Sequence, residues 1–316
     1  MNPIAAPFRW IFRKAAAGMR ERIEHLESRL ANLEETARIH SIHVGQLQVN
    51  EQSLQGRLRA MEAQNTRLLT LLSQTGSIDF SPHDPNDPTR ETPLSYPSYD
   101  VAQFVYRPAF RRAIEYLQCN DIAGDLFEFG TYRGFTARMI AESMVACNRQ
   151  GRLHLFDSFE GLPVSTDHAD EVSYEVRVRQ AWAAGAMNLP EGIDGRICRS
   201  IAALLGDDRV HVVKGYYEDT LEGNLPRGVN AALVHIDCDL YSSTRQVLDK
   251  LHEFDLLQDG CVVMCDDYNC NRANPKMGER GALHDFVARQ QRWSLSPWFA
   301  YGWHGQALLL HDANVG

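Results

Sequence analysis

Two short apolar runs in the C-terminal half of the chain each end in a pair of carboxylates. The run AALVHI leads into Asp237 and Asp239, and the run GCVVMC leads into Asp266 and Asp267. Apolar runs of this kind, rich in β-branched residues, predict buried strands. The carboxyl ends of such strands are where open α/β sheets hold their ligands. We therefore expect the four carboxylates to meet at one edge of a sheet.

Carboxylates that meet from neighbouring strands repel one another unless a positive charge lies between them. A hard divalent cation bound by oxygen ligands supplies that charge. The alternative is that each acidic pair caps a helix or faces solvent. Two such pairs, each at the end of an apolar run, favour a metal or polar site over that alternative.

From Asp100 onward, short apolar segments alternate with helical ones. The predicted strands lie near 125–129, 152–158, 209–214, 231–237, 260–265, 297–301 and 306–310. The predicted helices lie near 101–118, after Gly134, near 197–205 and near 243–257. This alternation is typical of a mostly parallel, doubly wound α/β sheet with helices on both faces. The polar insertions 165–190 and 268–280 fall where lids over the carboxyl edge of the sheet are expected.

A long helix is predicted before this domain. In residues 19–73, apolar residues recur at spacings that alternate between four and three positions, and these positions contain no proline or glycine. They form the seam along which two helices would pack. A 3.5-residue period kept over many turns predicts a left-handed coiled coil. Asn65 falls at an a position, which favours a dimer, whereas His40 and Glu51 weaken the middle of the seam. We expect self-association through this helix; the alternative is an amphipathic helix folded back on the globular domain.

The segments on either side of the predicted coiled coil differ in composition. Residues 1–18 mix aromatic and basic side chains, most densely over 7–16. Such a segment can lie at an anionic membrane surface, and the alternative is a frayed start of the coiled coil. Residues 74–99 contain five prolines, which predicts an extended linker. The remainder, residues 100–316, forms the predicted catalytic domain.

Charge and cysteine usage limit the partners and the compartment. Residues 1–74 hold 10 Lys/Arg and 7 Asp/Glu, a net charge of +3, so the rest of the chain carries −12 of the total of −9. A domain this acidic is not expected to bind nucleic acid, which requires a basic face. Seven scattered cysteines without a CxxC pair fit a reducing compartment. We expect a cytoplasmic protein, with residues 7–16 as a candidate for peripheral contact with the inner face of the membrane.

The first predicted strand leads into a turn with features of a cofactor site. Gly130 and Gly134 flank this turn, so a ligand can approach the backbone closely. The spacing is not the GxGxxG of a pyrophosphate site, and Glu128 just before the first glycine would repel phosphate. A carboxylate can instead pair with a cationic ligand, which favours a sulfonium cofactor over NAD. The alternative is a tight turn in which Glu128 forms a salt bridge.

Two further strand ends extend the predicted cofactor site. Asp157 ends the second strand, where an acidic residue typically accepts hydrogen bonds from ribose hydroxyls. The third strand ends in GYYED, where Tyr216 or Tyr217 can wall an adenine ring. The alternative is an ordinary helix start, with Glu218 or Asp219 near the positive end of the helix dipole.

Six motifs in the sequence occur in the order seen in the macrocin O-methyltransferase (TylF-type) family. They are EFGTYRGFT, LFDSFEGLP, GYYEDTL, HIDCDLYSST, DDY and ALHDF. The chain resembles this family over roughly residues 100–290. The resemblance implies a class I S-adenosylmethionine-dependent methyltransferase fold and Mg²⁺-dependent methylation of a sugar hydroxyl. The layout is also similar to that of the catechol-type O-methyltransferases, whose metal site uses the same strand ends.

The resemblance also implies roles for individual residues. The implied cofactor contacts are Glu128, Gly130, Thr131, Gly134, Asp157, Ser158, Tyr217, Glu218 and Asp237. The implied metal ligands are Asp237, Asp266 and Asp267. Asp239 matches the second acid of the family's D-x-D, and either Asp237 or Asp239 is the expected base. A metal-bound carboxylate is a weak base, which favours Asp239, whereas the family analogy favours Asp237. His284 matches a family histidine whose role stays open.

We therefore expect an O-methyltransferase that uses S-adenosylmethionine and Mg²⁺ to methylate a sugar hydroxyl of a glycoside, polysaccharide or natural product. Coordination by a metal lowers the pKa of the hydroxyl, and a carboxylate then removes the proton. The alternative is a coiled-coil interaction protein with an inactive methyltransferase-like head, against which the intact acidic set and glycine turn argue. A nicotinamide oxidoreductase predicts GxGxxG, which the sequence lacks.

Overall fold

The computed structural model describes residues 99–315 together with a few positions between 19 and 40. Those few positions are helical, and Met19, Leu26, Leu30 and Leu33 among them are each more than half exposed. The rest of the predicted coiled coil lies outside the described residues. So do the basic-aromatic segment and the predicted linker, except that the linker's last residue begins the first helix of the domain.

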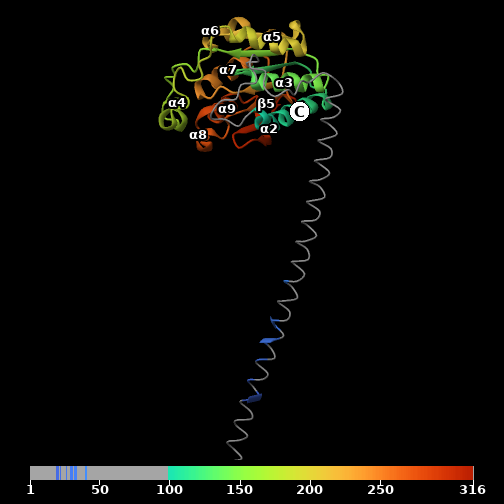
Figure 1. The fold of residues 1–316 in the computed structure, drawn as a ribbon, viewed down its shortest axis with the longest axis vertical. Coiled ribbons are helices and arrows are strands. Elements are labelled where there is room, and N and C mark those ends of the chain that lie inside the picture. Colours follow the sequence, from blue (N-terminus) through green and yellow to red (C-terminus); the bar gives the residue numbers. More distant parts are fainter. Residues whose placement is uncertain are drawn as a thin grey trace, which may run out of the picture. The chain divides into compact units, whose positions relative to one another are not determined.

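The domain is built on a seven-stranded sheet in the order β3-β2-β1-β4-β5-β7-β6 (Figure 1). The strands are β1 (Asp125–Phe129), β2 (Leu153–Asp157), β3 (Val210–Lys214), β4 (Ala231–Ile236), β5 (Val262–Cys265), β6 (Trp293–Tyr301) and β7 (Gly305–Asp312). The first five strands pair in parallel, whereas β7 runs antiparallel to both β5 and β6. The predicted mostly parallel α/β sheet is confirmed, with an antiparallel hairpin at one edge.

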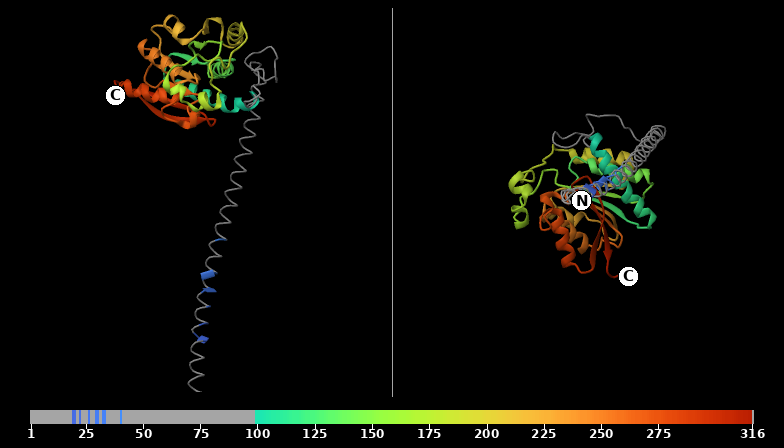
Figure 2. Two further views of the ribbon diagram at one scale, coloured as in Figure 1. Left: turned by 90° about the vertical axis from the view of Figure 1, so that its left-hand side faces the viewer. Right: turned by 90° about the horizontal axis from the view of Figure 1, so that it is seen from below.

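Helices cover both faces of the sheet (Figures 1 and 2). One face packs against α2 (Tyr99–Cys119), α3 (Phe135–Ala146) and α5 (Ile193–Leu205). The other packs against α6 (Tyr217–Asn224), α7 (Tyr241–Glu253) and α9 (Gly278–Arg289). Successive side chains of β1 alternate between the two layers: Leu126 belongs to the first and Phe127 to the second. Burial on both faces explains why the strands read as continuous apolar runs. In the part of the chain that the structure describes, no helix combines the length and apolarity that crossing a membrane requires.

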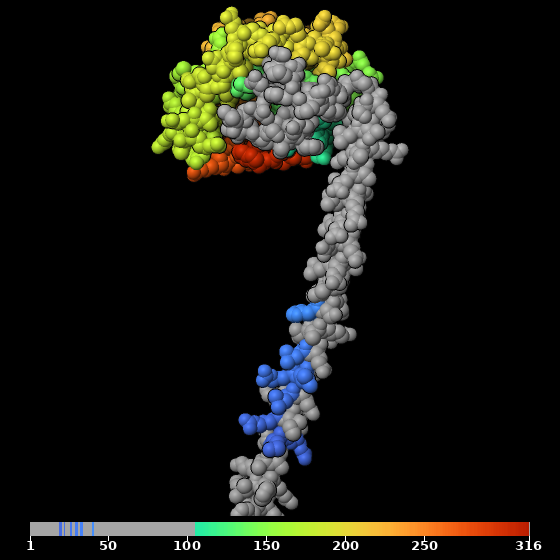
Figure 3. Space-filling model, in the orientation of Figure 1, coloured from blue at the N-terminus to red at the C-terminus, as the bar shows by residue number. Residues whose placement is uncertain are grey.

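The two polar insertions contain short helical turns. The first holds α4 (His168–Glu171) and the π-helical turn Glu175–Arg179, and the second holds α8 (Cys270–Ala273); a 3₁₀ turn, Asp207–Arg209, precedes β3. In the space-filling view the first insertion (yellow-green) forms one end of the face shown, and the C-terminal strands (red) lie along its lower edge (Figure 3).

Helix α9 is absent from the sequence prediction, which placed its first residues in a loop. Its first residue, Gly278, has φ 55°, and Gly281 disfavours a helix by about 1 kcal/mol relative to alanine. Its buried side chains Leu283 and Phe286 pack onto the face that also holds α7. Tertiary packing therefore stabilises this helix against its local sequence.

Candidate active site

A cleft of about 1710 Å³ opens at the carboxyl ends of the parallel strands. Its walls come from the turns that follow β1, β2, β3, β4 and β5, together with the first insertion and the turn between β6 and β7. This is the edge at which the sequence predicts ligand binding. The predicted site residues that line the cleft are Gly130, Thr131, Asp157, Ser158, Tyr217, Glu218, Asp237, Asp239, Asp266 and Asp267.

The turn after β1 depends on its first glycine. Gly130 has φ 91°, and a Cβ added to it would lie 1.7 Å from the carbonyl oxygen of Asp237. Only glycine therefore lets the end of β1 sit directly against the acidic loop after β4, where the amide of Asp237 donates to the carbonyl of Phe129 at 2.8 Å. Gly134 does not line the cleft; with φ 78° it precedes α3, and its N–H donates to the carbonyl of Thr131 at 2.7 Å.

Asp157 ties the end of β2 to this turn. Its Oδ2 accepts the amide N–H of Tyr132 at 2.7 Å, and its Oδ1 accepts that of Phe159 at 2.6 Å. Burial raises the pKa of Asp157, and these amides act in the opposite direction. Each carboxylate oxygen retains a second lone pair for a ligand hydroxyl. Thr131 adds a buried Oγ1 with no hydrogen-bond partner within the described residues.

The structure places Glu128 away from the cleft lining. Its fully buried Oε1 lies 3.1 Å from Nδ1 of His235, the residue opposite it across β1 and β4. The ring of His235 meets Phe110 edge-on, with centroids 5.0 Å apart. Because alternate strand residues face opposite layers, Glu128 points into the core on the α2 side. The geometry matches the alternative of a paired carboxylate, not a cofactor contact.

Three aspartates form the tightest acidic group. Asp237, Asp239 and Asp267 each offer a carboxylate oxygen, and these oxygens all lie within 4.8 Å of one another. Asp266, which the resemblance places among the metal ligands, also lines the cleft. Its Oδ2 accepts the hydroxyl of Tyr106 at 3.0 Å, whereas its buried Oδ1 accepts no hydrogen bond from the described residues and lies 3.7 Å from Nδ1 of His304. The predicted convergence of four carboxylates is thus observed, with Asp239 closer to the centre of the group than expected.

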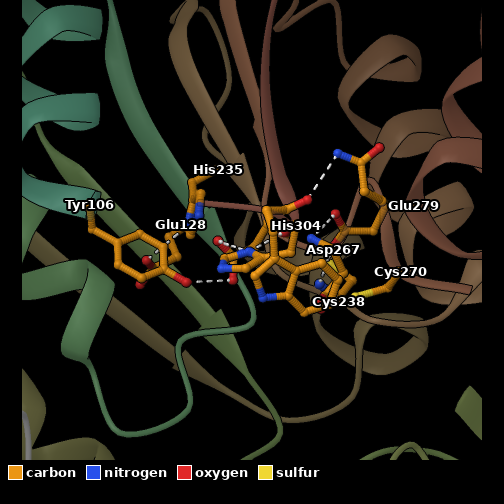
Figure 4. Close-up of polar contacts among 11 residues, drawn as sticks. Tyr106, Glu128, His235, Cys238, Asp267, Cys270, Glu279 and His304 are labelled. Carbon is orange, nitrogen blue, oxygen red and sulfur yellow. Dashed lines mark hydrogen bonds and ion pairs between the residues drawn. The ribbon is translucent and has the colours of Figure 1, made fainter. Parts of the chain in front are cut away.

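Glu279 joins the two acidic loops and was missed by the sequence prediction. This fully buried carboxylate accepts the amide N–H of Cys238 on Oε1 and that of Asp267 on Oε2, each at 3.0 Å (Figure 4). Glu279 lies in the first turn of α9, where an acidic residue is ordinarily explained by the helix dipole. Nothing local in the sequence marks its burial.

Further side chains surround the acidic group (Figure 4). Cys270 donates its S–H to Oδ1 of Asp267 at 2.9 Å. His304 donates from Nδ1 to the carbonyl oxygen of Asp266 at 2.8 Å. His284, by contrast, is exposed, and its Nε2 lies 3.5 Å from the hydroxyl of Tyr268, outside the cleft lining.

The crowded carboxylates perturb one another's protonation. Burial, followed by repulsion from neighbouring carboxylates, raises the pKa values of Asp237, Asp239 and Glu279 well above their ordinary range. The same two causes raise the pKa of Asp266 to about 6. A cation placed among these groups would relieve both effects.

Without a cation, we expect the protein to become less stable as pH rises from about 4 to about 6. The pKa of Asp266 is raised from 3.8 to about 6 in the folded chain, so between these values the folded state binds more protons than the unfolded state. Stability then falls with rising pH, by about 3 kcal/mol for a shift of this size. The measurement is the thermal unfolding midpoint at pH 5 and pH 7, with EDTA or with excess Mg²⁺. Mg²⁺ should raise the midpoint more at pH 7, and an equal effect at both pH values would contradict the expectation.

The sheet order and the cleft across the strand ends define a class I methyltransferase fold, which two solved structures share. The O-methyltransferase NovP has a TM-score of 0.53 and 21% identity, over 71% of this chain and 86% of that chain. The calicheamicin methyltransferase CalS11 has a TM-score of 0.53 and 21% identity, over 77% and 90%. The chain belongs to the macrocin-O-methyltransferase (TylF) family, which it matches over residues 46–291. No curated protein matches it.

Proposed function

We propose that the protein is an S-adenosylmethionine- and Mg²⁺-dependent O-methyltransferase that acts on a sugar hydroxyl of a glycoside, polysaccharide or glycosylated natural product. The observation that carries the proposal is the close approach of the turn after β1, at Gly130, to the acidic loop after β4, at Asp237. It brings a cofactor turn and an acidic metal-type site into one cleft. Family membership, and the fold shared with a methyltransferase named for calicheamicin, support the sugar-containing acceptor.

S-adenosylmethionine would be held by the turns after β1, β2 and β3. Gly130 and Thr131 line the cleft, and the unpartnered Oγ1 of Thr131 offers a hydrogen bond. Asp157 and Ser158 would take the ribose, and Tyr217 and Glu218 would contact the adenine end; all four line the cleft. The donor supplies an already activated methyl group, so positioning the acceptor accounts for much of the remaining catalysis.

Mg²⁺ would be held by Asp237 and Asp267, with Asp266 completing the predicted ligand set. The donors are all oxygens, as a hard cation prefers, and Oδ1 of Asp266 accepts no hydrogen bond from the described residues. Bound there, the ion would lower the pKa of the acceptor hydroxyl.

Asp239 is the base in this proposal. It lines the cleft and is 5% exposed, and as a carboxylate outside the proposed metal ligand set it is available to accept the hydroxyl proton. Glu279 supports the site indirectly. Its two hydrogen bonds fix the backbone amides of Cys238, the neighbour of Asp239, and of Asp267.

The N-terminal part of the proposal concerns assembly and location. The exposed apolar side chains Met19, Leu26, Leu30 and Leu33 fall on the two seam rows of the predicted coiled coil, and pairing two copies would bury them. We infer a cytoplasmic dimer. Residues 7–16, which lie outside the described residues, are the candidate segment for peripheral membrane contact. The acidic catalytic domain disfavours a nucleic-acid partner.

The decisive test is transfer of labelled methyl from S-adenosylmethionine to a panel of methyl glycosides, with Mg²⁺ or with EDTA. Calorimetry with S-adenosylmethionine measures cofactor binding separately. Cofactor binding with Mg²⁺-dependent transfer to at least one glycoside supports the proposal. Absence of cofactor binding would point instead to an inactive head and to the N-terminal helix as the functional part.

A further inference from the structure

We propose that Trp303 is a sugar-stacking platform at the mouth of the cleft, and that the acceptor is an oligosaccharide of at least two rings. This inference rests on the proposed function, since it specifies the substrate class of the same cleft. The evidence is the exposure of the indole, the anchoring of its backbone and the size of the cleft.

Trp303 is 69% exposed and lines the cleft. Within residues 99–315, the other tryptophans are buried or half-buried: Trp182 is 5% and Trp293 is 3% exposed, and Trp298 is half-buried against Tyr116. Scattered exposed apolar residues are common on protein surfaces. An exposed indole on the rim of a ligand cleft is different, because binding sites use aromatic side chains to cover the apolar parts of ligands.

The backbone around Trp303 is fixed to the acidic loop. Asn269 donates from Nδ2 to the carbonyl of Trp303 at 3.3 Å and from its amide to the carbonyl of His304 at 2.9 Å. His304 donates in turn to the carbonyl of Asp266 at 2.8 Å. The close-up labels His304 together with side chains of the acidic site (Figure 4). These three hydrogen bonds hold the backbone that carries the indole, and the indole meets the ring of His304 edge-on with centroids 5.3 Å apart, as a preorganised binding platform requires.

The chemistry of the indole matches a carbohydrate ring. One face of many pyranoses presents C–H groups, which form a flat apolar surface between polar edges. A tryptophan ring offers a complementary flat surface of large area. Val164, which is 80% exposed and lines the same cleft, adds apolar surface.

The cleft also has room for more than one sugar ring. Its volume of about 1710 Å³ includes the proposed S-adenosylmethionine site, and it exceeds the roughly 300–1,000 Å³ of a site for one small molecule. The reacting hydroxyl must reach the acidic group, where Asp239 is 5% exposed, whereas Trp303 is 69% exposed at the rim. The proposal therefore assigns the reaction and the stacking to two different rings of the acceptor.

The test compares acceptor length in wild type, Trp303→Ala and Trp303→Phe. The probes are methyl glycosides of mannose, rhamnose, galactose and glucose, each as one, two and three rings. Methyl transfer gives kcat and KM, and saturation-transfer NMR with S-adenosylhomocysteine reports binding without turnover. Val145→Ala, at an exposed apolar residue of α3 outside the cleft lining, is the matched control. Thermal unfolding verifies that each variant folds.

In wild type, KM is expected to fall as the acceptor grows from one ring to two or three. Trp303→Ala should raise KM for the longer acceptor about tenfold, as expected for the loss of roughly one buried apolar contact surface. It should leave kcat, and turnover of the single-ring acceptor, within about twofold. Trp303→Phe should retain most of the length advantage because it keeps an aromatic face, and Val145→Ala should retain all of it.

The outcomes separate this inference from the proposed function. Methyl transfer to glycosides supports the function. If KM depends on acceptor length equally in Trp303→Ala and wild type, or does not depend on it in wild type, the platform is overturned. Trp303-dependent binding of oligosaccharides without transfer supports the platform and overturns the function. Absence of both transfer and oligosaccharide binding in wild type overturns both.

Discussion

Asp239→Asn is expected to lower kcat by about 10²–10⁴-fold, the usual contribution of a general base. The substitution removes the proton acceptor while keeping the shape of the side chain. It also suits the backbone, because Asp239 has φ 60° and asparagine tolerates the left-handed region well. Stability should not fall, because one carboxylate leaves a group in which neighbouring charges raise each other's pKa. Steady-state methyl transfer measures the effect on kcat.

Asp237→Asn is the matched comparison for this prediction. If Asp237 is a metal ligand and Asp239 the base, Asp239→Asn retains Mg²⁺ binding by calorimetry, whereas Asp237→Asn loses both binding and activity. The reverse pattern would assign the base to Asp237. Activity of Asp239→Asn within threefold of wild type would remove Asp239 from the proposed mechanism.

Glu279→Gln is expected to raise the Mg²⁺ concentration required for half-maximal activity by about 10–100-fold, as loss of a ligand-positioning partner commonly does. The two oxygens of Glu279 accept amide N–H groups from Cys238 and Asp267. Glutamine supplies only one acceptor there and turns an N–H₂ group toward the other amide. The resulting unsatisfied buried donor should also cost about 1–3 kcal/mol of stability.

Asp285→Asn is the control for Glu279→Gln. Asp285 lies on the same helix, is exposed, and accepts the hydroxyl of Tyr241 at 2.7 Å. Its substitution should leave the Mg²⁺ requirement unchanged. If Glu279→Gln also had the wild-type requirement, the positioning role of this carboxylate would be wrong. Activity titrated with Mg²⁺, together with thermal unfolding, provides both measurements.

The parts of the site that the sequence predicts are those determined by local pattern. Asp237 and Asp266 follow apolar runs, and the end of a buried strand places such residues at one edge of a parallel sheet. Gly130 is recognisable because a glycine between a strand and a helix marks a close approach of the backbone. These signals were sufficient to predict the α/β sheet, the cleft edge and the convergence of the acidic residues.

The parts that the sequence does not predict depend on contacts between distant segments. Tyr106 reaches Asp266 across 160 positions of sequence, and Glu279 joins two loops from a helix with little local helical signal. Glu128 was expected at the cofactor, but the alternation of side chains along β1 places it in the core with His235. A strand that is buried on both sides has an uninterrupted apolar sequence. Such a sequence does not indicate on which face of the sheet a given side chain lies.

The close approach at Gly130 has a consequence for engineering. Since a Cβ there would collide with the carbonyl of Asp237, the turn after β1 and the loop after β4 cannot be diversified independently of each other. Libraries aimed at new acceptors should leave both untouched. The first insertion lines the same cleft from outside the parallel strands, and it is the segment at which randomisation is most compatible with retained catalysis.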